Sequence, residues 1–314
     1  MTPTANQFRT AWRDSASLTA TAGLMLVALI PTVLGIFLDN RMVTGVPVWL
    51  KPAKFAISSA IYAATLFWMF RYIRIWPRFV DAMGRTVARV LVLEVVIIYI
   101  QAARGTTSHF NVATPIDGVL FGVMGISIVV LWLASVGVLV ALLRQSFPNA
   151  AWGWSLRLGL LISLLGSGAG GLMLRPTPEQ ESELRAGRIS PVGRHTVGAP
   201  DGGTGLPGVG WSTQHGDLRI PHFFGMHAFQ IVPALGWLLT RRRRSKQVEI
   251  VFATAASYLT LLAILMWQAL RGQPLIHPDG TTLLTLGVWF ASTALAFLFL
   301  PDTEPDDRVV ATPR

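Results

Sequence analysis

The sequence predicts an all-α integral membrane protein, a polytopic bundle of about eight transmembrane helices. Of its 314 residues, 52% are hydrophobic and 13% are charged, and the mean hydropathy is +0.51. This composition is too apolar for an ordinary soluble domain. The apolar residues also gather in runs of roughly 20, the length needed to cross about 30 Å of hydrocarbon. We therefore expect residues 1–314 to form a single membrane domain.

Charge and cysteine content restrict the function further. The net charge of +10 does not predict a nucleic-acid partner, because the arginines lie between apolar runs, where they act as topology signals and contact lipid headgroups. Membrane lipids are the expected partners, together with a small-molecule or lipid substrate whose identity the sequence leaves open, as it does the oligomeric state. The chain has no cysteine, which excludes disulfides, thiolate zinc sites, iron–sulfur clusters and thiol catalysis.

Each predicted span follows from an apolar run and its flanks. The first, 18–38, follows a polar segment and has no small-residue cleavage pattern after it, so it is a retained helix. The second begins near Lys54 and ends in RYIRIWPRF, whose Trp, Tyr and Arg residues suit a headgroup interface. The remaining spans are expected at 87–103, 115–143, 155–174, 221–240, 248–270 and 282–300.

The basic residues predict the orientation of these helices. Eight spans place both termini on one side, and the cytoplasm is the side with the excess of Lys and Arg in short loops. The run RRRRSK after 221–240 and the arginines of 71–89 both lie on the side of the termini. Residues 1–17 and 301–314 are therefore expected to be cytoplasmic, and the protein to lie in the inner, or plasma, membrane.

Residues 175–220 are expected to form an extracytoplasmic loop rich in Gly and Pro. The stretch GAPDGGTGLPGVG in its middle offers too few apolar side chains to pack a core. Loops longer than about 15 residues without secondary structure are usually lids, binding segments or disordered. The sequence leaves a lid over the outer surface and a plain linker as alternatives.

Two glycine patterns predict close helix packing. GSGAGG at 166–171 matches the spacing of a dinucleotide-binding fingerprint, but that motif needs a strand and a soluble helix, and this one lies in a membrane-length run. Small residues four apart, such as Gly166 and Gly170, instead allow two helices to approach closely. The same interpretation applies to Gly118, Gly122 and Gly125.

Glu94 is the only acidic residue well inside a predicted span, about 15 Å below Arg104 at the outer end and near the membrane midplane. Gln101 lies seven residues further on and so on nearly the same helix face. The pair must face protein or water, because lipid offers no hydrogen-bond partner. A buried carboxyl of this kind either fixes helix packing or serves as a proton carrier or ligand.

The segment QAARGTTSHFNVATPIDG, which joins the third and fourth spans, collects polar residues at the outer side. Thr114, Pro115 and Asp117 fit an N-terminal capping box, with the acid favoured by the helix dipole. Asp117 therefore has a structural interpretation besides a functional one. His109 has no such structural role and is a candidate site residue.

Two histidines lie in the first turns of the sixth predicted span. His222 and His227 differ by five residues, about 140° around the helix, so they are not the pair four residues apart that holds one zinc ion. Gln230 shares a face with His227. We expect His227 to reach the interior at the depth of Glu94, and His222 to face the outer side with His109 or His215.

These residues define the predicted site, which opens to the outer face. Histidine supplies acid, base and metal-ligand chemistry near neutral pH. The predicted catalytic residues are Glu94, His109, Asp117 and His227, the predicted cofactor contacts are Gln101, His222 and Gln230, and the candidate metal ligands are His109, His222 and His227. Lys51 and Lys54, in KPAKF, lie on the same rim, where they either extend to headgroups or attract an anionic group.

WLKPAKFAIS, RGTTSHFN and DLRIPHFFGMHAFQ together resemble a group of bacterial multi-pass membrane proteins, and the resemblance covers most of the chain. It implies a membrane architecture and no particular activity. Ser108, His109 and Asp117, followed by late histidines, are also loosely similar to membrane hydrolases of the alkaline ceramidase and adiponectin-receptor kind, which hold zinc by three histidines. Those proteins use H-x-x-x-H and seven helices, whereas this chain has H-x-x-x-x-H and about eight predicted spans. Haem-bearing helix bundles are similar in needing only two facing histidines.

Three classes of function agree with this sequence. The favoured one is a membrane-embedded enzyme or redox protein, with a divalent metal ion or haem b as open choices of cofactor. The first alternative is a transporter or proton-coupled carrier whose pathway includes Glu94, Gln101, His227 and Gln230. The second alternative is a structural or accessory membrane protein.

Overall fold

The structure is a computed structural model that describes residues 16–188, 191–241 and 246–299. Within those residues, eight helices are long and apolar enough to cross a membrane, so the predicted all-α polytopic bundle is confirmed. They are α2 (Ala16–Leu38), α3 (Leu50–Phe70), α4 (Pro77–Ala103), α5 (Pro115–Arg144), α6 (Ala150–Ala169), α8 (Arg219–Thr240), α9 (Gln247–Leu270) and α10 (Gly280–Leu298). A short 3₁₀ helix, η1 (Gly170–Leu174), continues α6.

Three helices begin four or more residues earlier than predicted, and one of them, α6, begins at Ala150 rather than at Ser155. α3 begins at Leu50 rather than near Lys54, and α4 begins at Pro77 rather than near Val87. A proline in the first turn suits a helix start, because the N–H that it lacks has no partner there in any case. The first turns of α4 also carry exposed charged side chains, which lie outside the apolar run. An apolar run therefore marks where a helix meets lipid, not where the helix begins.

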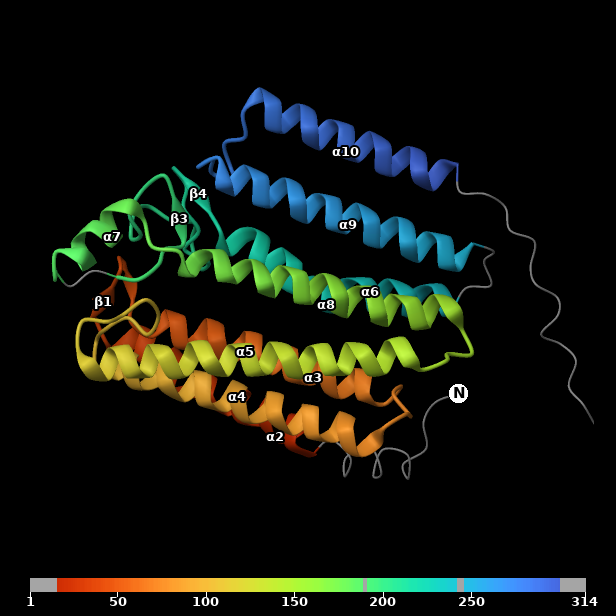
Figure 1. Cartoon of the computed structure of the whole chain (residues 1–314), viewed down its shortest axis with the longest axis horizontal. Helices are drawn as coiled ribbons and strands as arrows, with labels where there is room; N and C mark the ends of the chain where they lie inside the picture. Colours follow the sequence, from red (N-terminus) through yellow and green to blue (C-terminus); the bar gives the residue numbers. More distant parts are fainter. Residues whose placement is uncertain (1–15, 189–190, 242–245, 300–314) are drawn as a thin grey trace, which may run out of the picture.

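The eight helices form two groups of four, which lie side by side in Figure 1. In one group, α4 packs against α2, α3 and α5; in the other, α8 packs against α6 and α9, and α9 packs against α10. Contacts between α5 and α6 join the groups. α2 begins and α10 ends at the same end of the bundle (Figure 1), as an even number of spans requires. The assignment of that end to the cytoplasm stays a prediction.

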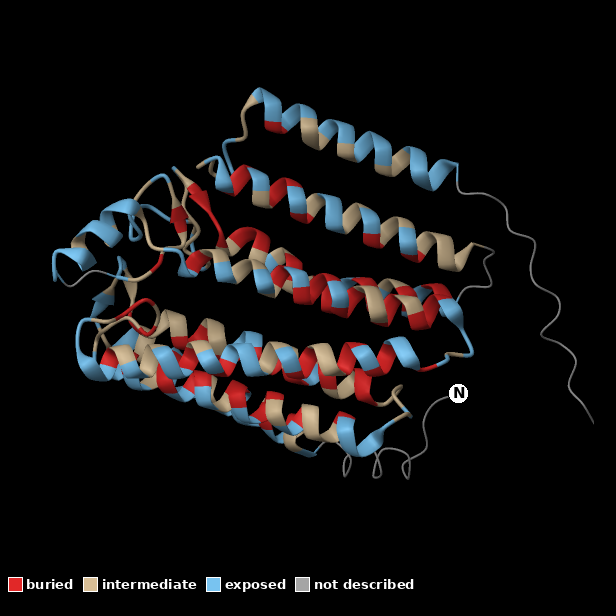
Figure 2. Ribbon diagram, in the orientation of Figure 1, coloured by how far each residue is buried: buried red, intermediate tan, exposed pale blue. Residues whose placement is uncertain are grey.

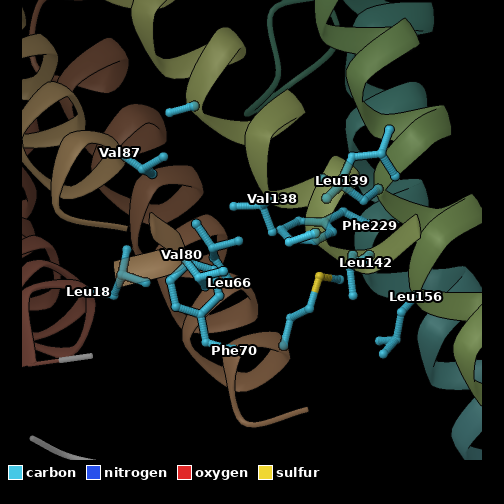
Figure 3. Close-up of a cluster of buried hydrophobic side chains, with 14 of the residues drawn as sticks. Leu18, Leu66, Phe70, Val80, Val87, Val138, Leu139, Leu142, Leu156 and Phe229 are labelled. Carbon is cyan, nitrogen blue, oxygen red and sulfur yellow. The ribbon is translucent and has the colours of Figure 1, made fainter. Parts of the chain in front are cut away.

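A large hydrophobic cluster lies where the two groups meet. It contains buried side chains from α2, α3, α4, α5, α6 and α8. Phe229 of α8 is fully buried and lies beside Val138 and Leu139 of α5 in Figure 3. Burial is concentrated in this region, whereas α10 is largely exposed (Figure 2). Apolar side chains on such outer faces need no protein partner in a membrane, because lipid tails cover them.

Glycine permits a close contact between α6 and α8. An added Cβ at Gly166 would lie 2.4 Å from Cα of Gly225, so the two backbones meet there and a larger residue does not fit. The predicted close approach of this helix to a neighbour is thus confirmed. The same prediction for α5 is wrong, because added Cβ atoms at Gly118, Gly122 and Gly125 would meet no atom within 4 Å. Spacing alone does not show which face of a helix meets protein.

Residues 175–218 lie at one end of the bundle, at the left of Figure 1. We call this segment the outer loop, and this end the outer end, after the predicted orientation. The outer loop contains α7 (Pro178–Arg185) and a two-stranded sheet of β3 (Thr196–Val197) and β4 (Gly216–Asp217). A second hairpin, β1 (Met42–Val43) with β2 (Val46–Pro47), lies at the same end (Figure 1).

Backbone hydrogen bonds and a small hydrophobic cluster seat the outer loop on the helices. Val192 N donates to Phe110 O at 3.0 Å, and Arg194 N donates to Met173 O at 2.8 Å. The cluster consists of Phe110, Met173, Leu218 and Ala269, with Val197 packed against it. The loop contributes Leu218 and Val197 to this cluster, and the other named members come from the rest of the bundle. These contacts attach the loop to one end of the bundle.

Candidate functional site

The carboxylate of Asp117 is held in the turn between α4 and α5. Its Oδ1 accepts hydrogen bonds from Gln101 Nε2 at 2.9 Å and from Arg104 Nη1 at 2.6 Å. Its Oδ2 accepts one from Thr114 Oγ1 at 2.7 Å, and that hydroxyl oxygen accepts one from the Asp117 N–H at 3.2 Å. The predicted N-cap is thus confirmed. The hydrogen bonds that close this turn explain why Asp117 and Gln101 are buried polar residues here.

His109 meets a lysine from the first turn of α3. Lys51 Nζ lies 3.2 Å from His109 Nδ1, and Ser108 Oγ lies 3.1 Å from the same nitrogen. An ammonium group only donates, so Nδ1 accepts and the ring proton is on Nε2 while Lys51 is charged. Nδ1 then already accepts a hydrogen bond from Lys51, so its lone pair is not free to take a proton from Ser108. Ser108 and His109 are therefore poorly placed for nucleophilic catalysis.

A second histidine, His195 of the outer loop, lies on the other side of Phe110. The centroid of the Phe110 ring is 6.2 Å from that of His109 and 5.0 Å from that of His195. His195 Nδ1 lies 2.7 Å from Asp201 Oδ2, and both Asp201 oxygens also accept from backbone N–H groups. The sequence did not predict this pair, because its two members, six residues apart, follow no helical or strand spacing; the fold of the loop brings them together.

The surroundings favour the uncharged form of both histidines. Burial lowers the pKa of His109 well below its usual value, and the charges of Lys51 and His195 lower it further. Burial likewise lowers the pKa of His195, although Asp201 opposes this. Burial would raise the pKa of Asp201, but hydrogen bonds from the His195 ring and from backbone N–H groups hold it well below its usual range. At neutral pH the cluster thus contains two neutral imidazoles and a carboxylate.

Glu94 is buried in α4, where it is 3% exposed. Among the described residues, neither of its carboxyl oxygens has a hydrogen-bond partner. The charged side chain that acts on it electrostatically is Lys51, which also contacts His109. The predicted polar stripe of Glu94 and Gln101 faces protein, since both residues are buried. Gln101, however, bonds to Asp117 rather than to Glu94.

The two histidines of α8 have different surroundings. His222 Nδ1 lies 2.9 Å from Gly166 O in α6, so it donates there and secures the contact between α6 and α8. His227 Nδ1 lies 3.2 Å from Gln230 Oε1, and Gln230 Nε2 donates to Thr65 Oγ1 of α3 at 3.0 Å. The face of α8 that carries His227 and Gln230 therefore borders α3.

Two basic side chains tie the outer loop to the helices. Lys54 Nζ donates to Val209 O at 3.1 Å, and Arg219 Nη2 donates to Gly210 O at 2.6 Å. Arg219 also forms an ion pair of 2.5 Å with the buried Asp217. Lys51 and Lys54 both have partners within the chain, His109 and Val209. Their positions therefore require neither contact with headgroups nor capture of an anion.

The predicted site residues do not form one hydrogen-bonded group in the described part of the chain. No hydrogen bond there joins any two of Glu94, His109, His222 and His227. α4 packs chiefly on α2, α3 and α5 rather than on α8, so the helix pair expected for a shared site is not a principal contact. Joint action of these residues stays a prediction.

Metal ligation was predicted for three of the histidines. Across residues 16–188, 191–241 and 246–299, no group of three His, Asp or Glu side chains is arranged to hold a metal ion. His109, His222 and His227 are thus not assembled as a ligand set in these residues. A divalent metal or haem b as cofactor stays a prediction.

Comparison with known proteins adds no relative, since no family model, curated protein or solved structure matches the chain. The fold therefore defines the class by itself. It is that of an integral membrane protein with a multi-pass helical bundle.

Proposed function

We propose that the protein is a proton-coupled membrane carrier in which Glu94 takes up and releases the proton. One observation carries this proposal: the Glu94 carboxyl is buried among the helices, and neither oxygen has a hydrogen bond within the part of the chain that the structure describes. An ionised carboxylate in that setting would cost several kcal/mol, so Glu94 holds its proton in this conformation. It ionises only when water or a partner reaches it, which ties its protonation to a conformational change.

The groups between Glu94 and the outer surface support a path for this proton. Lys51 acts electrostatically on Glu94 and contacts His109, and His109 is an uncharged base. Across one aromatic ring, His195 and Asp201 continue the series into the outer loop. Series of acids and bases that lead to a buried carboxyl are typical of proton relays in pumps and transporters.

The same geometry supports a carrier better than the enzyme that the sequence favours. Lys51 engages the nitrogen of His109 that a nucleophilic Ser108 would need. Glu94 has no bond to that pair and no evident task in its chemistry. A carrier uses both features, since it needs a carboxyl that binds a proton inside the membrane and a covered cluster that exchanges protons with one side.

Proton entry into proteoliposomes tests this proposal. The purified protein is reconstituted with a pH-sensitive dye inside, and a potassium gradient with valinomycin imposes a potential that is negative inside. We expect acidification with the wild-type protein, and entry as slow as in protein-free vesicles with Glu94→Gln. The control is Glu249→Gln, which removes a carboxyl from the first turn of α9 and should leave the rate unchanged.

Two results would overturn the carrier. One is equal proton entry for Glu94→Gln and the wild type. The other is a wild-type rate no faster than that of protein-free vesicles.

A further inference from the structure

His227 lies on a poorly covered side of α8. The same stripe carries Phe223, 41% exposed, and Ile231, 48% exposed, because residues four apart share a helix face. His227 follows Pro221 by six residues and so lies about 9 Å further along the helix, inside the apolar part of the span. Lipid tails offer no hydrogen-bond partner at that depth. A polar group on this stripe therefore needs a partner from elsewhere.

The hydrogen bonds around His227 determine which ring nitrogen is available. Thr65 Oγ1 donates to Ile61 O at 2.7 Å, and so it accepts from Gln230 Nε2. This directs Gln230 Oε1 to His227 Nδ1, and because an amide oxygen only accepts, Nδ1 carries the ring proton. Nε2 is then an acceptor. In the described part of the chain, no group donates a hydrogen bond to it.

Aromatic side chains border this acceptor on its outer side. The centroids of the Phe223 and His227 rings are 4.3 Å apart. Trp211 of the outer loop packs on Phe223 with ring centroids 5.4 Å apart. Apolar side chains thus lie next to an acceptor that no group of the described residues occupies, and binding sites for mostly apolar ligands combine these two features.

We propose that His227 Nε2 anchors a membrane-dissolved amphiphile that carries a hydroxyl group. The hydroxyl donates to Nε2, and the apolar body lies along the exposed side chains of Phe223 and Ile231. An ionised carboxylate has no proton to donate. An ammonium would need an acidic partner, and neither this stripe nor the facing residues Ile61 and Thr65 of α3 provide one.

This site is separate from Glu94, which lies on α4, and its test does not use proton transport. The two proposals can therefore fail independently.

Photo-crosslinking with two matched probes tests the site. A long-chain alcohol and an alkane of equal length, each with a diazirine at the same chain position, are added to the protein in nanodiscs, and labelled peptides are mapped by mass spectrometry. We expect the alcohol to label residues 223–231 about tenfold more than the alkane, the effect of one good hydrogen bond. The exposed apolar residues of α10 serve as the internal reference, where both probes should label equally.

Variants of the two α8 histidines make the test specific. His227→Asn keeps a polar group near the Nδ1 position but removes the Nε2 acceptor, so the preference for the alcohol should vanish. His227→Gln, whose amide oxygen reaches the Nε2 position, should retain part of it. His222→Asn alters a histidine that bonds to α6 instead and should leave the preference unchanged. Equal labelling of residues 223–231 by both probes, or a preference that survives His227→Asn, would overturn the proposal.

Discussion

The carboxylate of Asp117 shows how much a single side chain contributes at the outer end of α4. It pairs with Arg104 and accepts hydrogen bonds from Gln101 and Thr114. Asp117→Asn removes the charge and one strong acceptor, and Gln101 is fully buried, so we expect unfolding to become easier by about 1–3 kcal/mol. Thermal unfolding in detergent, followed by tryptophan fluorescence, measures this.

A surface ion pair provides the matched control for that substitution. Asp81 pairs with Arg85 one turn away, and both side chains are exposed. Asp81→Asn should therefore change stability by less than about 1 kcal/mol. If the two substitutions cost the same, the Asp117 network has no special role.

Histidine 109 gives stability a dependence on pH. Burial lowers its pKa in the folded protein, whereas in the unfolded chain the pKa returns to about 6.5. Below that pH the imidazole of His109 binds a proton in the unfolded state but stays neutral in the folded state. The contribution of His109 to the free energy of unfolding is therefore fully present above about pH 6.5 and is lost as the pH falls below it. His109→Gln should reduce this decline in unfolding measured over an acidic pH series. An unchanged decline would show that His109 is not buried in its neutral form.

At the site, contacts within a few residues of a helix start could be predicted from the sequence, whereas contacts that depend on tertiary packing could not. The cap formed by Thr114 and Asp117 was predictable because its partners lie three residues apart. The contact of Lys51 with His109 and the pair of His195 with Asp201 depend on how α3 and the outer loop pack. No periodicity encodes such contacts, since the first joins two segments distant in the chain and the second depends on the irregular fold of the loop.

Among the helices, α6 and α8 depend most visibly on small residues. Gly166→Ala would place a Cβ 2.4 Å from Cα of Gly225, so the helices must separate, and we expect a loss of about 1–3 kcal/mol in stability. Gly122→Ala in α5 meets no atom within 4 Å and should be neutral or stabilising by up to about 1 kcal/mol. Unfolding of the two variants under identical conditions compares them. Equal effects would contradict the close contact.

Apolar runs predicted the number of spans because each must cross the same hydrocarbon thickness. They could not predict the neighbours of each helix, and the expected pairing of α4 with α8 is not a principal contact. Gly166 and Gly122 occur in similar spacings, yet only Gly166 meets a partner. The partner helix, rather than the motif, decides whether a glycine packs.

For the whole molecule, the orientation in the membrane is open to a direct test. The chain has no cysteine, so single cysteines can be introduced without background. Ser182→Cys lies in α7 of the outer loop, and Ser146→Cys lies between α5 and α6 at the opposite end. An impermeant maleimide should label only the first in intact cells. Labelling of Ser146→Cys alone would invert the orientation.

The protonation of Glu94 within the bundle can be measured by infrared spectroscopy of the purified protein. A protonated carboxylic acid has a C=O stretching band that a carboxylate lacks. Because both Glu94 oxygens are buried without hydrogen bonds to any described residue, we predict this band at neutral pH in the wild type and in Glu249→Gln, and its loss in Glu94→Gln. A wild-type spectrum without the band, or a band of unchanged intensity in Glu94→Gln, would contradict a proton held on Glu94.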